Sequence, residues 1–352
     1  MGKISTIGLD IGTTAVRAVQ VEHSGSPGLG PATILKAGEV ALPHGAVRDA
    51  EVIDNGVVAT AIKKLWRDAG LAGKDVIIGI GNQRVVVRNL DLPWMPMDQI
   101  RQSLAYQVGE TLPMSVDEAL LDFLPTAEGD GPDGRFVSGM FVAAVKDTVA
   151  ANVLAVEAAG LLPRVVDLNA FALLRALIRG DAGQRTAAFI DVGARVTNVV
   201  IAERGVPRLV RTIAAGGQDA TDAIARAAKL PDAEAEQFKR QVGLGVGSVP
   251  GMDDAVEACA TATRNLVDAV TNTLSYYSSQ HRGAGVEMLV LTGGGVHMPG
   301  LGQYLSSATR IPATLGDPFQ GMTWGRSARR DQIAGRESSF ALATGLASGV
   351  VA

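Results

Sequence analysis

The sequence predicts an α/β protein built from two similar halves, and three observations support this prediction. The chain has 352 residues, 47% of them hydrophobic and 19% charged, so it can bury a large core and form two or three domains. Segments 7–21 and 188–202 align so that Asp10 falls on Asp191, and the glycine two positions later matches as well. Apolar strand-like runs alternate with helical patterns after each of these segments.

The first segment reads as a strand, a tight turn and a second strand. Its apolar run ends at Asp10, Gly12 permits a tight turn, and a strand rich in β-branched residues follows Thr13 and Thr14. Backbone N–H groups of such a turn can converge on an anion, and a carboxylate at the strand end can hold a divalent cation through its waters. We therefore expect these four residues to form one half of a phosphate and metal clamp.

The second half of the chain begins with the same pattern. Here Asp191 ends the apolar run, Gly193 and Ala194 form the turn, and Thr197 starts the second strand. One such turn alone occurs at many ordinary hairpins. Two copies at the heads of two equivalent halves instead indicate a paired clamp around one ligand.

The segment between the two halves has its own pattern of strands and helices. Asp98 is expected to cap a helix over 98–110, whose apolar positions lie on one face. A strand over 136–145 and a helix over 147–159, capped by Asp147, follow. The pattern predicts a β-rich segment with two helices, inserted into the first half.

Two further sites follow the second clamp. Gly216 and Gly217 precede a helix, where backbone N–H groups can approach a phosphate. Glu236 and Lys239 are three residues apart on one helical face, where they could hold ribose hydroxyls or simply form a solvated ion pair.

A triple glycine late in the chain is the last candidate element. Gly293, Gly294 and Gly295 lie between a buried strand and a helical pattern, so the backbone can approach a flat ring or a phosphate closely. The segment lacks both the dinucleotide-binding glycine spacing and the Lys-Ser/Thr ending of a P-loop, which excludes these two motifs.

Composition excludes several functional classes. The formal net charge of −4 and an aromatic content of 4% give no basic, aromatic surface for nucleic acid. Cys259 is the single cysteine, so no internal disulfide can form, and we expect it to fill the core. Four scattered histidines show no metal-ligand spacing. The sequence shows no signal peptide and no membrane-spanning run, so we expect a cytoplasmic protein.

The chain resembles the actin-like ATPase superfamily, because its elements occur in the same order: the two clamps, the paired glycines, the Glu-x-x-Lys helix and the triple glycine. The resemblance implies an actin-like (RNase H-like) fold in which two α/β domains close on ATP and Mg²⁺. Asp10 and Asp191 would then hold Mg²⁺ through water, and the turns at 12–14 and 193–197 would hold phosphates. Glu236 and Lys239 would face the ribose, and residues 293–295 the adenosine.

Four stretches, in the inserted segment and after it, together resemble the PilM family of type IV pilus assembly proteins. The resemblance depends on "LDLPWMPMDQI", "GETLPMSVDEALLDF", "EAAGLLPRVVDLNAFALLRAL" and "LSYYSSQ", and it extends over nearly the whole chain. It implies ATP binding and capture of the cytoplasmic N-terminal tail of the membrane protein PilN, in a groove between the first domain and the insertion. The helices over 98–110 and 147–159 are candidate groove walls, although their apolar faces could equally pack on the local sheet. Other inner-membrane pilus assembly proteins and the pilus motor ATPases are further candidate partners, and the protein would lie at the inner face of the membrane.

The resemblance also suggests how the chain divides into domains. The first actin-like domain would be discontinuous, with a small α+β subdomain inserted into it. The expected segments are 1–75 (first domain), 76–160 (insertion), 161–185 (connector helix of the first domain), 186–325 (second domain) and 326–352 (return to the first domain).

Several alternatives stay open at the level of sequence. An FtsA-like cell-division protein shares the fold and an insertion in the same domain, and a sugar kinase can begin with the same "DIGTT" motif. Arg195 could contact phosphate or point to solvent. Hydrolysis needs a group that orients water, for which Asp167 and Asn169 are candidates of undefined geometry, so the sequence supports ATP binding more than turnover.

Overall fold

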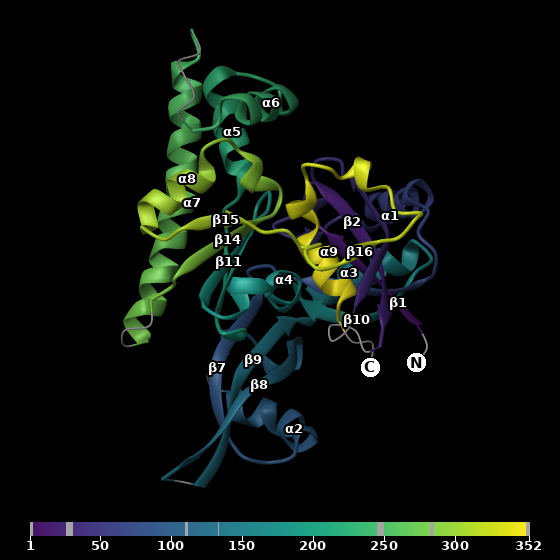
Figure 1. Cartoon of the computed structure of the whole chain (residues 1–352), viewed down its shortest axis with the longest axis vertical. Coiled ribbons are helices and arrows are strands. Elements are labelled where there is room, and N and C mark those ends of the chain that lie inside the picture. The colour runs from purple at the N-terminus through teal and green to yellow at the C-terminus, as the bar shows by residue number, and fades with distance from the viewer. Residues whose placement is uncertain are drawn as a thin grey trace.

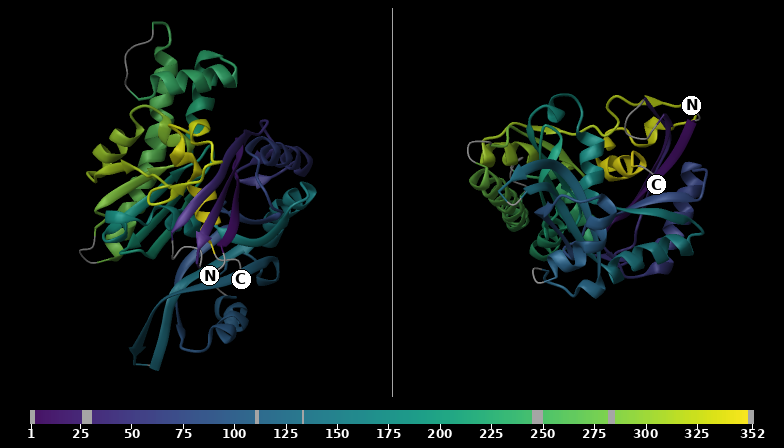
Figure 2. Two further views of the ribbon diagram at one scale, coloured as in Figure 1. Left: turned by 45° about the vertical axis from the view of Figure 1, so that its right-hand side comes forward. Right: turned by 90° about the horizontal axis from the view of Figure 1, so that it is seen from below.

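The computed structural model describes residues 3–25, 31–109, 112–132, 134–244, 250–281 and 285–349. Two mixed sheets with helices on their faces form the body of the molecule, and a third, smaller sheet projects from it (Figure 1). The projecting sheet extends away from the body in the left view of Figure 2 as well. The α/β fold with two similar halves is confirmed.

The first sheet has six strands in the order β10-β6-β1-β2-β3-β16. Apolar side chains of α1 and α3 share a core with one of its faces, while α4 and α9 lie against the other. The strands are β1 (Lys3–Ile11), β2 (Ala15–Ser24), β3 (Ala32–Ala41), β6 (Asp75–Ile80), β10 (Leu162–Leu168) and β16 (Thr323–Trp324). The helices are α1 (Asn55–Ala69), α3 (Lys146–Ala158), α4 (Asn169–Leu177) and α9 (Ala341–Ala347).

The second sheet has five strands in the order β13-β12-β11-β14-β15. Helices α5, α7 and α8 cover one face, and α4 packs on the other face, so α4 lies between the two sheets. The strands are β11 (Thr186–Val192), β12 (Thr197–Glu203), β13 (Val206–Ile213), β14 (Met288–Thr292) and β15 (Ala313–Leu315). The helices are α5 (Gly217–Ala228), α6 (Asp232–Val242), α7 (Asp253–Gln280) and α8 (Leu301–Thr309). Cys259 of α7 is buried in this core, as expected.

The two halves repeat each other in strand pairing. Strand β1 pairs antiparallel with β2 and parallel with β6, and β11 pairs antiparallel with β12 and parallel with β14. The aligned aspartates therefore occupy equivalent positions, each near the end of a central strand.

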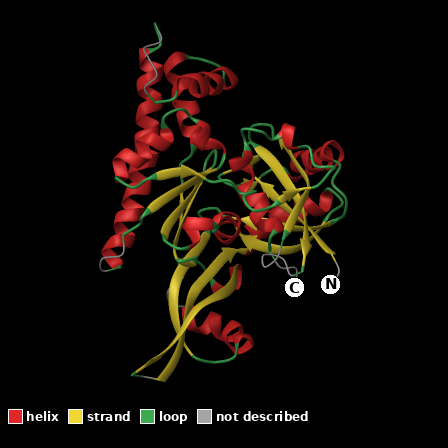
Figure 3. Cartoon of the chain, viewed as in Figure 1, coloured by secondary structure: helices red, strands yellow, loops and turns green. Residues whose placement is uncertain are grey.

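The projecting sheet has the order β7-β9-β8, and one helix covers one of its faces. Its members are β7 (Val85–Pro93), β8 (Ala119–Gly131), β9 (Gly134–Val145) and α2 (Met97–Val108). Ile100, Leu104 and Val108 of α2 are buried against this sheet, so the predicted apolar face forms its core. Figure 3 shows the long β8–β9 hairpin extending well beyond α2.

The expected insertion, 76–160, contains two elements that do not belong to the projecting sheet. Strand β6 pairs with β1 and β10 of the first sheet, and α3 packs on α1 and β10. The alternating pattern of the sequence did not show that β6 and β7 join different sheets. We propose to limit the insertion to about residues 85–145, and keep the remaining domain boundaries as predictions.

Two predicted helix caps are wrong. Helix α2 begins after Pro96 and α3 after Val145, and neither start has a side-chain cap. Asp98 and Asp147 lie instead in the first turns, where their negative charge interacts favourably with the helix dipole, but their side chains do not cap the helix.

The remaining short elements connect these layers. They are β4 (Val47–Arg48) and β5 (Glu51–Val52), and the 3₁₀ turns η1 (Val116–Glu118), η2 (Gly180–Gly183), η3 (Gly294–His297), η4 (Arg330–Gln332) and η5 (Glu337–Phe340). Across the part of the chain that the structure describes, no helix combines the length and the apolar character that crossing a bilayer requires.

The contact between α4 and α9 gives a first prediction. A Cβ added to Gly345 would lie 1.8 Å from the carbonyl oxygen of Ala172, which is backbone and has no room to move. Replacing Gly345 by alanine should therefore lower the free energy of unfolding by about 1–3 kcal/mol, measured by urea denaturation.

Gly56→Ala is the matched control. Its Cβ would meet only Oδ1 of Asp54, the N-cap residue of α1, at 3.4 Å, which is about an ordinary van der Waals distance. Unfolding should stay as in the wild type or become harder, because alanine reduces the entropy of the unfolded chain. Equal stability of the two variants would contradict the proposed close contact.

Candidate functional site

The two clamp turns border one cavity between the halves of the molecule. In the first, the Gly12 N–H donates to the Ala15 carbonyl at 3.0 Å, and in the second the Gly193 N–H donates to the Val196 carbonyl at 3.0 Å. The two turns thus share one backbone geometry. All predicted site residues line this cavity except Thr197 and Gly216.

Asp10 and Asp191 come from the two halves, line the same cavity and are both buried. Burial, opposed by the charge of Arg17, raises the pKa of Asp10 to about 6. Burial and then the charge of Asp10 raise the pKa of Asp191 to about 7, so the two carboxylates are close enough to repel each other. The fold therefore holds two acids that resist ionisation, and a cation between them would relieve this cost.

The donor set fits Mg²⁺ held through water. Among the described residues, no group of three or more His, Cys, Asp or Glu side chains could enclose a metal. Mg²⁺ commonly binds one or two carboxylates and completes its shell with water and phosphate oxygens, which two carboxylates beside two phosphate-type turns would allow. Asn169 also lines the cavity, but its Oδ1 atom is buried against Gly79 and has no hydrogen-bond partner among the described residues.

The start of α5 supports the second turn. The N–H groups of Gly217 and Gln218 donate to the carbonyls of Gly193 and Ala194 at 2.9 and 2.8 Å, and the Gly216 N–H donates to the Asp219 carboxylate at 2.8 Å. These amides already have partners, so the structure gives them a positioning role and does not support a direct amide contact with phosphate. Gly216 itself lies off the cavity.

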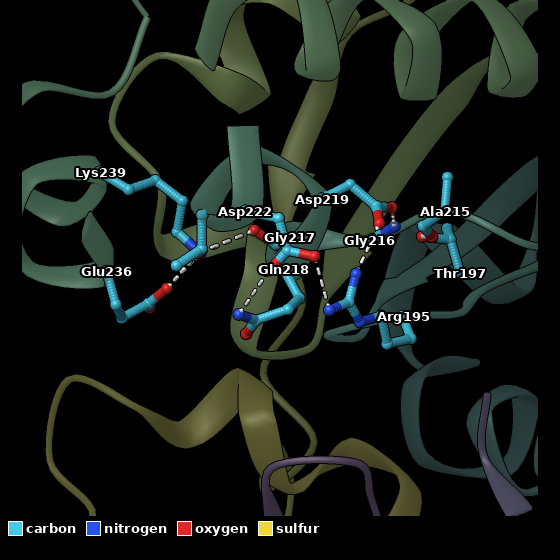
Figure 4. A network of polar contacts seen from close by, with 11 residues as sticks. Arg195, Thr197, Ala215, Gly216, Gly217, Gln218, Asp219, Asp222, Glu236 and Lys239 are labelled. Atoms are coloured by element: carbon cyan, nitrogen blue, oxygen red, sulfur yellow. Dashed lines mark hydrogen bonds and ion pairs between the residues drawn. The ribbon is translucent and has the colours of Figure 1, made fainter. Parts of the chain in front are cut away.

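Arg195 takes neither of the two positions considered for it. Its guanidinium contacts Asp219 at 3.0 Å and Asp222 at 2.6 Å, both on α5 (Figure 4). The arginine therefore ties the second clamp turn to the start of α5. Thr197 also acts inside the fold, because its fully buried hydroxyl donates to the Ala215 carbonyl at 2.8 Å.

Glu236 and Lys239 form the ion pair that their spacing predicts, at 2.6 Å (Figure 4). The buried Lys239 ammonium also donates to the Gly217 carbonyl and the Thr221 hydroxyl, each at 2.8 Å, so its three hydrogens have protein partners. Burial works to raise the pKa of Glu236, but hydrogen bonds from Lys239 and Thr221 outweigh it and hold that pKa below its usual range. Of the pair, Glu236 is the better candidate for a ribose contact, while Lys239 fixes α6 to α5.

The triple glycine closes another side of the cavity. Gly293 has φ +89°, and a Cβ there would lie 2.5 Å from the Val192 carbonyl and 2.6 Å from the Asp191 carboxylate. Only glycine fits this position without displacing the Asp191 carboxylate. The turn continues as the 3₁₀ element η3, and the following α-helix, α8, starts only at Leu301.

Sequence reasoning missed several residues of the cavity wall. Arg17 and Asn198 lie opposite Asp10 and Asp191 in the two hairpins, and both line the cavity. Arg17 approaches Asp10 to 3.8 Å and Glu39 to 2.5 Å. The hairpin register would have identified both positions, because each lies seven residues after its aspartate.

Comparisons with known proteins identify the family of this chain. The family model described as type IV pilus assembly protein PilM matches residues 8–349. The chain belongs to the PilM family. The predicted family is thus confirmed, and the FtsA-like and sugar-kinase alternatives are not needed to explain the sequence.

Solved structures confirm the actin-like fold of this PilM family member. A chain of a PilM-PilN type IV pilus biogenesis complex is 25% identical, with a TM-score of 0.84 and 98% of both chains covered. MreB 5 of Spiroplasma citri bound to AMPPNP is 13% identical over 97% of this chain and 94% of that one, with a TM-score of 0.53, and shares the fold alone. Among curated proteins, the cell division protein FtsA of Bacillus subtilis is 23% identical over 336 residues, which are 84% of this chain and 74% of FtsA.

The raised pKa values predict how stability depends on pH. In the folded state the pKa of each acid lies above its ordinary value of 3.8, so the folded state binds these two protons more tightly than the unfolded state. Protonation of the two acids therefore favours folding, and this contribution is lost as the pH rises. Without Mg²⁺, the free energy of unfolding should fall as the pH rises from about 4 through about 7, and Asp191→Asn should flatten this fall. Urea unfolding in EDTA between pH 5 and 8 measures both slopes.

Asp68→Asn is the control for that measurement. This carboxylate is exposed on α1, and the Lys64 and Arg67 side chains lower its pKa, so it titrates below the measured range. The control should keep the wild-type slope, and an unchanged slope in Asp191→Asn would contradict the buried-acid assignment.

Proposed function

We propose that this PilM family member is an ATP-binding scaffold of type IV pilus assembly, which holds Mg-ATP in its central cavity and captures the cytoplasmic N-terminal tail of PilN. The main support is the convergence of two buried carboxylates, from matching hairpins of the two halves, on one cavity lined by glycine turns. Isolated buried carboxylates are costly, and a bound cation would offset this cost.

The residues suggest a division of roles in binding. Asp10 and Asp191 would orient the waters of a bound Mg²⁺, and the two clamp turns would bind the phosphates. Glu236 would bind the ribose, and residues 293–295 would lie against the adenosine. A bound Mg²⁺ would neutralise phosphate charge, and the chain itself supplies the fixed acceptors around it.

The geometry supports binding more than turnover. The Asp167 carboxylate accepts hydrogen bonds from the Arg175 guanidinium and the Leu168 N–H, so it is committed to the fold. Asn169 lines the cavity, but a neutral amide can orient a water and cannot take its proton. We propose slow hydrolysis or none.

Capture of PilN is supported by the similarity to a chain of the PilM-PilN complex. The apolar face of α2 is used in the core of the projecting sheet, so a bound tail would need other side chains. Exposed leucines on the projecting sheet and on elements of the first sheet layer are better candidates: Leu120 and Leu124 on β8, Leu154 on α3 and Leu162 on β10. Binding to PilN would place the protein at the inner face of the membrane, with other inner-membrane pilus proteins and the motor ATPases as further proposed partners.

Removing either carboxylate should weaken nucleotide binding. Each of Asp10→Ala and Asp191→Ala should raise the Kd for Mg-ATP about 10–100-fold, because each removes an acceptor for the metal's waters. Calorimetric titration measures the Kd, and circular dichroism confirms that the variants are folded. Asp68→Ala, on the exposed face of α1, should bind like the wild type; a normal Kd in both cavity variants would overturn the nucleotide proposal.

Nucleotide and tail binding should be coupled, because both involve the first half of the chain. A fluorescent PilN-tail peptide should bind with a Kd that differs at least about fivefold between Mg-ATP and nucleotide-free protein. The Asp191→Ala variant should lose this difference at the same ATP concentration. Equal affinity in the two states would remove the coupling and leave the scaffold proposal in place.

A further inference from the structure

A groove separate from the nucleotide cavity lies between the projecting sheet and the second sheet. Its volume is about 960 Å³, within the range of protein ligand sites. Residues 85–89 of β7 form one wall and residues 208–212 of β13 the other, with Met140 and Tyr276 also contributing. Its walls include no residue of the first sheet, so it differs from the groove proposed above for the PilN tail.

Both walls are edge strands. In the described part of the chain, β7 ends the order β7-β9-β8 and β13 ends the order β13-β12-β11-β14-β15. The strands approach each other where the Asn89 side-chain amide donates to the Arg208 carbonyl at 2.9 Å, and no backbone ladder is described between them. Edge strands with unpaired backbone groups can bind an added extended segment.

The positive charge of the groove favours an added segment that carries acidic side chains. Three arginines line it, Arg88, Arg208 and Arg211, and its described lining contains no aspartate or glutamate. Arg208 is paired with Glu203 at 3.2 Å. Arg211 is exposed, and no ion pair is described for it, so its guanidinium can bind an added carboxylate. This local positive charge stands out in a chain of net charge −4.

The exposed ring of Tyr276 adds an apolar platform to the groove. It comes from α7 and keeps 53% of its surface exposed. Tyrosine offers a large contact area with a polar tip, which suits a protein partner.

We infer that this groove binds an extended, acidic segment of a partner protein, which adds as a strand to the edge of β13 or β7. Backbone hydrogen bonds would supply affinity, and carboxylates paired with Arg211 would supply selectivity. The recessed shape and the backbone walls favour a peptide over a flat anionic membrane, so vesicle binding is an outcome to be tested.

Fluorescence anisotropy of the full chain tests the inference. The probe is a fluorescein-labelled twelve-residue peptide of alternating glutamate and threonine. It should bind at least tenfold more tightly than the matching lysine–threonine peptide, and Arg211→Glu should weaken it at least tenfold. Arg326→Glu, an exposed arginine far along the chain in the loop after β16, is the matched control and should bind like the wild type.

A second peptide separates strand addition from simple charge attraction. A glutamate–threonine peptide with N-methyl groups on alternate residues keeps its charge but cannot pair with a sheet edge along the methylated side. It should bind at least tenfold more weakly than the unmethylated peptide. Equal binding of the two, equal binding of the lysine peptide, or no effect of Arg211→Glu would each overturn the inference.

A further experiment tests whether the groove binds the anionic headgroups of a membrane and not an acidic peptide. Phosphatidylglycerol vesicles should not sediment the protein in an Arg211-dependent way, and such sedimentation without peptide binding would overturn the inference in favour of a lipid surface. None of these measurements involves ATP or PilN, so their failure would leave the proposed function untouched.

Discussion

The burial of two like charges at one cavity is the constraint on which the rest of the site depends. Asp10 and Asp191 end central strands of the two halves, and the fold has withdrawn both from water. Their raised pKa values show that the ionised forms are costly without a cation. Gly293 approaches Asp191 where a side chain would not fit, and Arg17 brings a positive charge to within 3.8 Å of Asp10.

The inner layer of the molecule keeps this pair in position. Helix α4 lies between the two sheets, and α9 packs on α4 and β1 through glycines that leave no room for a side chain. Ser339 and Leu342, in the segment that returns from the second half to the first, line the cavity. The Gly293 N–H donates to the Ser338 carbonyl at 3.2 Å, so the triple-glycine turn is tied directly to this returning segment. A change in the cavity would therefore reach the first half through short, packed contacts.

Many polar groups at the site form hydrogen bonds or ion pairs with other parts of the protein. Several polar groups in the predicted nucleotide-binding motifs bond to protein atoms instead: Arg195, Lys239, Thr197 and the amides at the start of α5. A buried donor without a partner is expensive, so a chain that places donors beside a glycine turn tends to satisfy them internally. Asn169 Oδ1 is the contrasting case, a buried acceptor without a described partner.

The sequence by itself determined the repeated hairpins, the pairing of Glu236 with Lys239 and the glycines of the cavity, because these follow from local spacing and backbone geometry. Periodicity also identified the apolar face of α2. Only the tertiary structure decided that β6 belongs with β1, that Arg195 holds α5, and that β7 and β13 leave two edges open beside each other. Those outcomes depend on which surfaces meet across long sequence separations, and local patterns carry no information about that choice.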